Sequence, residues 1–258
     1  MKPPLYIVKI GGNVIDDETA LHTFLSDFAL LEGSKLLVHG GGKLATRLAK
    51  ELGIPTSMHE GRRITDAETL KIVTMVYAGW VNKTIVASLQ NMQCNAIGLS
   101  GADASIIPAT RRKPQPIDFG FVGDVHPSAI NSSFLELLIA QHICPVCCAI
   151  THDGQGNLLN SNADTIASSL AIAMSTQFET HLVFCFEKSG VLSDPEDDNS
   201  VIPRITREKY QELKLNNIIT AGMIPKIDNA YKAIDAGVKE VVIKHARHLK
   251  EDIGTVIV

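Results

Sequence analysis

Short apolar runs alternate along this chain with longer stretches in which apolar residues recur every three or four positions. The first run lies in the sequence LYIVKIGG, which contains Lys9 and ends in two glycines. Comparable runs lie at residues 36–38, 142–150, 181–186, 238–244 and 255–258. Unbroken apolar runs are typical of parallel strands buried on both faces, and the longer stretches indicate amphipathic helices. The sequence therefore predicts an α/β protein, a three-layer αβα sandwich with a mainly parallel central sheet.

The helical stretches can be bounded by their capping residues. Helices are expected at residues 16–31, 43–53, 66–91, 134–142 and 227–237, and one more begins near Asp164. Residues 101–125 lack helical periodicity and contain several Gly and Pro, which predicts hairpins that project over a site. Residues 151–164 are expected to form a turn, and Ser132 and Ser133 are expected to cap the helix that follows them.

Two of the predicted strands end in glycine turns. Lys9 precedes Gly11 and Gly12, and His39 precedes three glycines that include Gly41 and Gly42. Ligands of parallel α/β sheets bind at the carboxyl ends of strands, and glycines there let the backbone and a helix N-terminus approach an anion. The alternatives are an ordinary tight turn and a lysine that merely reaches solvent. Neither turn has the spacing of a P-loop or of a GxGxxG dinucleotide site.

Polar residues elsewhere are candidates for the same rim of the sheet. Arg63 follows the second glycine turn, and its guanidinium suits bidentate capture of a carboxylate or phosphate, although a solvated basic pair with Arg62 is the alternative. Asn160, Asn162 and Asp164 crowd one helix start. A cap needs only one of these three side chains, so the other two are candidate ligand contacts.

Composition and charge exclude several classes of protein. The 258 residues are 45% hydrophobic and carry a net charge of −4, so a nucleic-acid partner is not expected. No signal pattern and no apolar window of membrane-spanning length are expected, which favours a cytoplasmic protein without a membrane partner. The five cysteines lie mostly in apolar runs and are expected to be small buried residues.

Six motifs occur in a fixed order: KIGG at 9–12, HGGG at 39–42, GRRIT at 61–65, GFVGDV at 120–125, NSNAD at 160–164 and GMIPK at 222–226. Together they resemble the amino-acid kinase family, and within it those members that phosphorylate N-acylated glutamate. The resemblance spans nearly the whole chain. It implies one continuous sheet with an acylglutamate-binding and dimerisation lobe at residues 1–175 and an ATP-binding lobe at residues 176–258.

The resemblance also implies roles for single residues. Lys9 and Lys226 would flank the transferred phosphoryl group, and Asp164 would orient both lysines. The acylated glutamate would be held by Gly41, Gly42, Arg63 and Asn160. ATP with Mg²⁺ would be bound by Gly11, Gly12, Glu187, Lys188, Ser189, Gly190, Val191, Leu192, Ile218, Ile219 and Thr220.

The implied activity is ATP-dependent phosphorylation of the side-chain carboxylate of N-acetyl-L-glutamate, the second step of arginine biosynthesis, by a homodimer that arginine does not inhibit. Two alternatives stay open. The acyl group could be succinyl, because the run Arg111, Arg112 and Lys113 could offer a cation to a second carboxylate. A non-catalytic sensor of acylglutamate or nucleotide is the alternative from another class.

Overall fold

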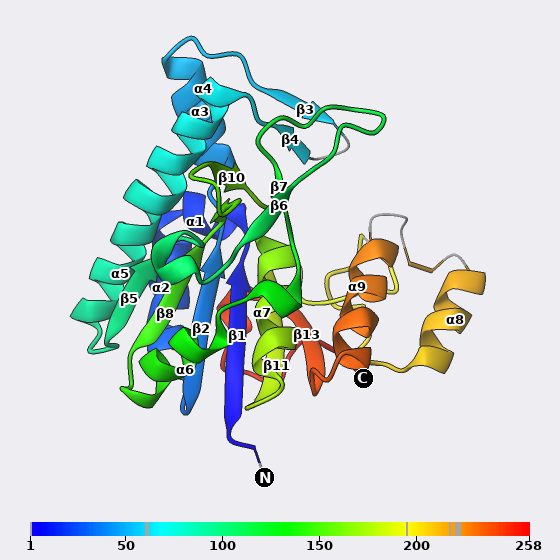
Figure 1. The fold of residues 1–258 in the computed structure, drawn as a ribbon. Coiled ribbons are helices and arrows are strands. Elements are labelled where there is room, and N and C mark those ends of the chain that lie inside the picture. The colour runs from blue at the N-terminus through cyan, green and yellow to red at the C-terminus, as the bar shows by residue number, and fades with distance from the viewer. Residues whose placement is uncertain (1, 60–61, 195, 217, 220–222) are drawn as a thin grey trace.

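A single central sheet runs through the part of the chain that the computed structural model describes, which is residues 2–59, 62–194, 196–216, 218–219 and 223–258 (Figure 1). Its eight strands lie in the order β12 (Arg204–Ile205), β14 (Thr255–Ile257), β13 (Glu240–His245), β11 (Glu179–Phe186), β1 (Pro4–Ile10), β2 (Ser34–His39), β8 (Cys144–Cys148) and β5 (Ala96–Leu99). Neighbouring strands are parallel except β13 and β14, which are antiparallel. The predicted mainly parallel sheet is confirmed.

Helices cover both faces of this sheet, as the apolar pattern predicted (Figure 1). On one face α7 (Ala163–Met174) packs over β1, β2 and β11 and contacts α9 (Ile224–Asp235). On the other face α2 (Glu18–Ala29) packs against α5 (Asn82–Asn91). The core between the layers includes β1, in which Leu5, Ile7 and Val8 are fully buried. The predicted division at residue 175 stays a prediction, since one sheet spans both parts.

The remaining elements extend these layers or lie above the carboxyl ends of the strands. The other helices are α1 (Gly12–Asp16), α3 (Gly42–Glu51), α4 (Ala67–Thr74), the π-helix η1 (Met75–Val81), α6 (Ser132–Ala140), α8 (Arg207–Leu215) and the 3₁₀ turns η2 (Asp103–Ser105), η3 (Pro127–Ala129) and η4 (Ala246–His248). Three antiparallel pairs join β3 (Ser57–His59) to β4 (Arg62–Ile64), β6 (Ala109–Arg111) to β7 (Gly123–Val125), and β9 (Ile150–His152) to β10 (Leu158–Asn160).

Local hydrogen bonding moved several predicted boundaries. The helix expected over residues 16–31 is found as α2, and it begins after Asp17, whose carboxylate accepts from the backbone N of Ala20 and caps it; the short helix α1 before it was not predicted. The cap of α6 is Asn131 rather than Ser132 or Ser133. Residues 151–164 are not a simple turn but include the β9–β10 hairpin, and helix α8 was not predicted.

One long helix runs from residue 67 to 91, and its middle turn is the π-helix η1. By length and composition alone this helix could cross a membrane, with a mean hydropathy of 1.3, contrary to the expectation that no segment is apolar enough. Its inward residues Val73, Ile85 and Leu89 are fully buried in the core. Its apolar character is therefore that of a core helix, with Met75 and Trp80 left exposed.

The cysteines occupy the positions expected for small apolar residues. All five are free thiols and all five are buried. Cys144 and Cys147 lie three residues apart on strand β8, so their side chains point to opposite faces of the sheet. This alternation does not suit a chelating or redox CxxC pair.

Candidate active site

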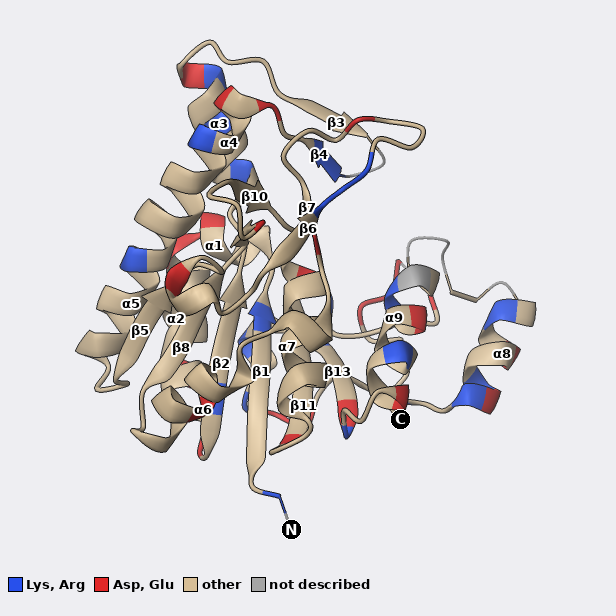
Figure 2. Ribbon diagram, viewed as in Figure 1, with Lys and Arg blue, Asp and Glu red and all other residues tan. Residues whose placement is uncertain are grey.

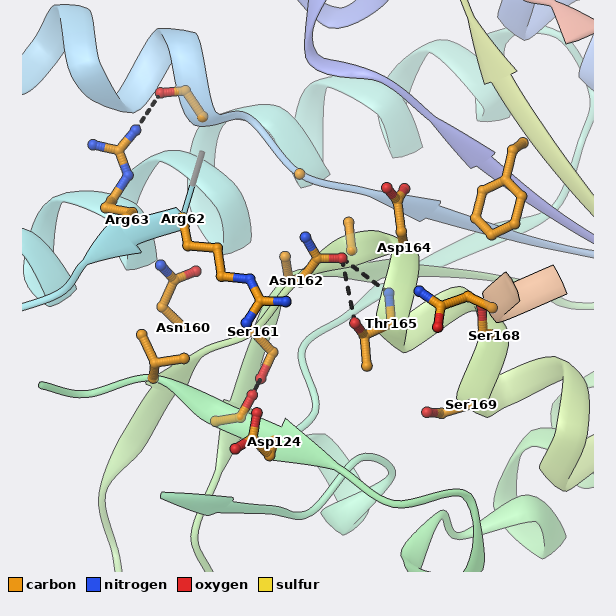
Figure 3. Close-up of a pocket in the computed structure, with 18 of the residues that line it drawn as sticks. Arg62, Arg63, Asp124, Asn160, Ser161, Asn162, Asp164, Thr165, Ser168 and Ser169 are labelled. Atoms are coloured by element: carbon orange, nitrogen blue, oxygen red, sulfur yellow. Dashed lines mark hydrogen bonds between the residues drawn. The ribbon is translucent and has the colours of Figure 1, made fainter. Parts of the chain in front are cut away.

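A cavity of about 540 Å³ lies beyond the carboxyl ends of the central strands (Figure 3). It is bounded by the glycine turn before α3, the first turns of α7 and α9, and the β4 and β7 hairpins. The predicted site residues that line it are Gly41, Gly42, Arg63, Asn160, Asp164 and Lys226. Segments separated by almost two hundred residues are thus brought to one place.

The strand order explains why the cavity forms here. Strand β1 lies between β2, which follows it in the chain, and β11, which comes much later. The connection that follows β1 and the one that follows its neighbour β11 therefore run in opposite directions along the sheet, and a crevice opens between two such diverging connections. Lys9 lies near the carboxyl end of β1, beside this crevice.

Lys9 is not among the described residues that line the cavity, but it forms an ion pair with Asp164, which does line it. Lys9 is buried, and its Nζ atom lies 2.7 Å from Oδ1 of Asp164 in the first turn of α7. A buried ammonium needs such a partner, since an unpaired charge out of water is costly. The predicted contact between Asp164 and one of the two lysines is observed, while its orienting role stays a prediction.

Lys226 reaches the same place from the first turn of α9. Its Nζ atom lies 4.1 Å from the ring centroid of Phe186, and Nζ of Lys9 lies 4.9 Å from the same centroid. The two ammonium groups therefore approach one aromatic ring at the end of β11. The sequence interpretation missed Phe186. The strand register in the structure explains its place, since Lys9 pairs with Phe184 and a residue two positions later points to the same face.

The second glycine turn requires glycine at Gly41. Its φ is +149°, a conformation that L side chains rarely adopt, and a Cβ there would lie 2.9 Å from Cδ1 of Tyr77. Gly42 then begins α3, so the free N–H groups of that helix start at the cavity. Glycine at this position thus lets the turn lie close to the ring of Tyr77 on η1, and Tyr77 also lines the cavity.

Arg62 and Arg63 differ in their surroundings. Nη2 of Arg63 donates to the carbonyl of Gly42 and to Oγ1 of Thr46, both at 2.8 Å, so this guanidinium fastens β4 to the glycine turn. Arg62 instead extends over the cavity, which it also lines (Figure 3). The sequence interpretation selected Arg63 and treated Arg62 only as its neighbour. Asn160 contributes its amide, whose Nδ2 donates to Oγ1 of Thr65 at 3.0 Å.

The buried side chain of His39 holds the glycine turn in place through a hydrogen bond to its backbone. Nδ1 of His39 lies 2.8 Å from the carbonyl of Gly40, and Nε2 lies 3.0 Å from the side-chain nitrogen of Asn82. Because a carbonyl only accepts and the amide nitrogen only donates, the proton of the neutral ring belongs on Nδ1. Complete burial lowers the pKa of His39 to about 4. His39 is therefore neutral at pH 7 and connects the turn to helix α5.

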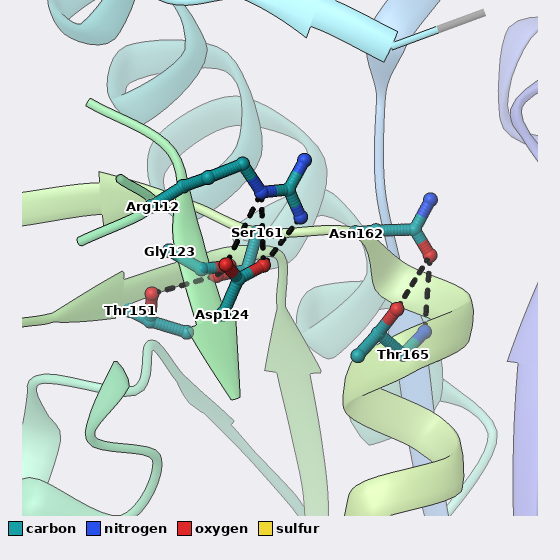
Figure 4. A network of polar contacts seen from close by, with 7 residues as sticks. All are labelled: Arg112, Gly123, Asp124, Thr151, Ser161, Asn162 and Thr165. Carbon is teal, nitrogen blue, oxygen red and sulfur yellow. Dashed lines mark hydrogen bonds and ion pairs between the residues drawn. The ribbon is translucent and has the colours of Figure 1, made fainter. Parts of the chain in front are cut away.

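A third group of polar residues lies on the β6–β7 hairpin. The guanidinium of Arg112 pairs with the carboxylate of Asp124, its Nε atom lying 3.1 Å from Oδ1 (Figure 4). Beside them, Oγ of Ser161 donates to the carbonyl of Gly123 at 2.8 Å. Figure 2 shows the basic residues of β4 and of this hairpin on neighbouring segments above the sheet. Arg112 and Asp124 both line the cavity. The sequence offered the run Arg111, Arg112 and Lys113 as a cation for a second carboxylate, and Arg112 is the member of that run that lines the cavity, whereas Asp124 was not singled out.

The described residues predicted to bind ATP do not line this cavity. Of the described residues that line the cavity, none is Gly11, Gly12, Ile218, Ile219 or a member of the run 187–192. The N–H of Gly11 donates to the carbonyl of Cys185 at 3.1 Å, and Lys188 pairs with Asp198 at 2.7 Å. Thr220 lies outside the described residues. A nucleotide site formed by the others stays a prediction.

Comparison with known proteins gives full-length matches. The profile of the Amino acid kinase family matches residues 4–245, which contain all six motifs. A protein of Phocaeicola vulgatus named acetylglutamate kinase is 55% identical over 257 residues, 100% of this chain and 99% of that one. The acetylglutamate kinase of Cytophaga hutchinsonii is 55% identical over 97% of this chain and 94% of its own. The crystal structure of smu.665 from Streptococcus mutans UA159 has a TM-score of 0.78 at 27% identity, covering 98% of each chain.

Proposed function

The chain belongs to the amino acid kinase family, as its motifs predicted, and we propose that it transfers the γ-phosphoryl group of ATP to the side-chain carboxylate of N-acetyl-L-glutamate. This reaction is the second step of arginine biosynthesis. The observation that supports it best is the meeting of Lys9, Asp164 and Lys226 at one crevice. These residues come from β1, α7 and α9, and no structural requirement of the sheet brings two lysines together there.

Phosphoryl transfer needs what this crevice offers. The transition state is loose and in line, and it asks the protein mainly for positioning and for positive charge around the moving group. Lys9 and Lys226 supply two cations, while Asp164 fixes the first of them at 2.7 Å. A carboxylate acceptor is already ionised at neutral pH and needs no general base. The buried His39 is neutral and engaged by two partners, so it is not available as such a base.

ATP enters as its magnesium complex, in which Mg²⁺ neutralises part of the phosphate charge. Mg²⁺ in kinases is held mainly by substrate phosphates and water, with few protein carboxylates. This suits the chain, because its described residues contain no group of three or more His, Cys, Asp and Glu that could hold a metal ion. We place the nucleotide at the end of β11, near the run 187–192 and Ile218 to Ile219.

The acylated glutamate would lie in the described cavity. Gly41, Gly42 and Asn160 line this cavity, and we assign the backbone N–H groups of the two glycines and the amide of Asn160 to the reacting end of the substrate, while a guanidinium suits its second carboxylate. Arg63 keeps the predicted place, but its Nη2 already serves Gly42 and Thr46. Arg62 is therefore a further candidate for that carboxylate.

One observation favours a second candidate substrate, N-succinyl-L-glutamate. Besides Arg63, the cavity is lined by Arg62 and by Arg112, whose partner Asp124 has a side chain that is 43% exposed. N-acetyl-L-glutamate carries a single carboxylate besides the one that accepts the phosphoryl group. A succinyl group adds another, for which a guanidinium at the hairpin would be a partner.

The test measures ATP turnover side by side with N-acetyl-L-glutamate, N-succinyl-L-glutamate and free glutamate, and traps the acyl phosphate with hydroxylamine. Turnover on the acetyl compound above the other two supports the proposal. Preference for the succinyl compound that falls in Arg112→Gln supports the second candidate. Equal rates on free glutamate would contradict an acyl site, and silence on all three would favour the non-catalytic sensor.

The proposed enzyme is a cytoplasmic homodimer in which two copies meet over the helix of residues 67–91. Trp80 is 70% exposed and Met75 53% exposed on η1, and edge strand β5 lies beside this helix. Large apolar side chains grouped on one helix are typical of a protein interface. Sedimentation should show a dimer that Trp80→Glu dissociates. Leu215→Glu, at the end of α8, where the side chain is 81% exposed, should leave the dimer intact. A monomeric wild-type protein would contradict the homodimer.

A further inference from the structure

The ring of Phe186 lies close to both Lys9 and Lys226. Nζ of Lys226 is 4.1 Å and Nζ of Lys9 is 4.9 Å from its centroid, and both distances are within the range of a cation–π interaction. Building on the proposed function, we propose that Phe186 is a positioning residue that holds both ammonium groups at the transferred phosphoryl group. It acts through the lysines and does not itself contact the reacting atoms.

The fold fixes this ring in place. Phe186 ends β11, next to β1, and its side chain is half-buried on the face that α7 and α9 cover. It stacks on Phe184 with centroids 6.1 Å apart, and Phe184 pairs in register with Lys9. A Cβ on Gly11 would lie 3.7 Å from the Phe186 ring, so the first glycine turn closes its other side. The ring is therefore held by β11 and by the turn that follows Lys9.

The second lysine depends on the ring more than the first. Lys9 already has Asp164 at 2.7 Å, while among the described residues Lys226 makes no ion pair. Two like charges drawn to one crevice repel each other, and a carboxylate for each would cancel the charge that phosphoryl transfer requires. An aromatic face attracts cations through its quadrupole and carries no net charge. Phe186 thus gathers both cations and leaves the crevice positive.

This role predicts a change in kcat rather than in KM. Phe186→Leu should lower kcat about tenfold and leave the KM for N-acetyl-L-glutamate within about twofold, because the acylglutamate contacts lie on other elements. Phe186→Tyr and Phe186→Trp keep an electron-rich face and should retain most of the turnover. Phe186→Leu should lower kcat by a larger factor in the protein that has both lysines than in a background in which Lys9 or Lys226 is already replaced.

Fluorination separates electrostatics from shape. Phenylalanine carrying one, two or three ring fluorines is placed at position 186 by suppression of a stop codon. Each added fluorine weakens the negative face of the ring, while the ring nearly keeps its size. We expect kcat to fall stepwise with fluorine number, with folding checked by circular dichroism and thermal unfolding. If Phe186→Leu does not fold, the fluorinated series still gives the answer.

The matched control is Phe28, a fully buried phenylalanine whose ring has Nζ of Lys35 at 5.5 Å, away from the cavity. Fluorination at position 28 should leave kcat unchanged. Flat kcat across the series at position 186, in an enzyme whose wild type turns over N-acetyl-L-glutamate, would overturn the positioning role alone. Absence of wild-type turnover on every acceptor would instead refute the proposed function.

Discussion

Acidification should destabilise this fold through His39. The ring is completely buried beneath the glycine turn, where its Nδ1 proton binds the carbonyl of Gly40 and its Nε2 atom accepts from Asn82. A second proton would remove the acceptor that Asn82 needs and would place a charge in the core. Burial accordingly lowers the pKa of His39 to about 4 from its usual value of 6.5.

The size of the effect follows from these two pKa values. His39 becomes protonated below about pH 6.5 in the unfolded chain, but only below about pH 4 in the folded protein. The stability that neutral His39 contributes is therefore complete above pH 6.5 and is lost as pH falls toward 4. One pKa unit is worth about 1.4 kcal/mol, so the loss amounts to roughly 3 kcal/mol over the whole range and about 2 kcal/mol between pH 7.5 and 5.

Urea unfolding measured at pH 7.5 and at pH 5 tests this value. His39→Gln keeps an amide that can replace part of the hydrogen bonding but cannot titrate, so its stability should fall by about 2 kcal/mol less than that of the wild type over the same interval. If the variant does not fold, the ring proton of His39 followed by NMR should show no titration above pH 5 in the native protein. Parallel pH dependence of the two proteins, or native titration near pH 6.5, would refute the reasoning.

Two further predictions concern single positions. Gly41→Ala should destabilise the fold by about 1–3 kcal/mol and raise KM for the acylglutamate, since the added Cβ would lie 2.9 Å from the ring of Tyr77. Gly79→Ala is the control and should do neither, because a Cβ there would have nothing within 4 Å. Equal unfolding curves for the two variants would contradict this prediction. Cys94 should be the first of three thiols alkylated at pH 7.5, because its contact with Cys144 lowers its pKa, whereas burial raises the pKa of Cys148 and Cys185 to about 12. Mass spectrometry that finds Cys148 or Cys185 modified first would exclude this.

The sequence was sufficient for features that depend on periodicity and on strand ends. Unbroken apolar runs identified the central strands, and because parallel strands share one carboxyl edge, Lys9, Gly41 and Asp164 could be expected together before any coordinates were known. The Lys9 to Asp164 ion pair is the direct consequence. Such predictions work because parallel strands bring their carboxyl ends to one edge of the sheet, whatever their side chains are.

Other features depend on side-chain competition that no local pattern encodes. Which of Arg62 and Arg63 points into the cavity was decided by Thr46 and Gly42, which take up the Arg63 guanidinium. The β9–β10 hairpin was read as a turn, since its strands have three residues each and show no alternation. Phe186 looked like one more apolar strand residue, and its importance appears only when α9 brings Lys226 against it.

The central claim is that Lys9 and Lys226 act on the transferred phosphoryl group. The measurement is kcat for ATP and N-acetyl-L-glutamate in Lys9→Ala and Lys226→Ala, together with the dissociation constants of both substrates. Lys71→Ala serves as the control, since this exposed lysine has Glu68 on α4 as its ion-pair partner among the described residues. The account predicts that kcat falls roughly 10²-fold or more in each site variant, with binding changed by no more than several-fold and the control unaffected. Unchanged turnover in either site variant would contradict it.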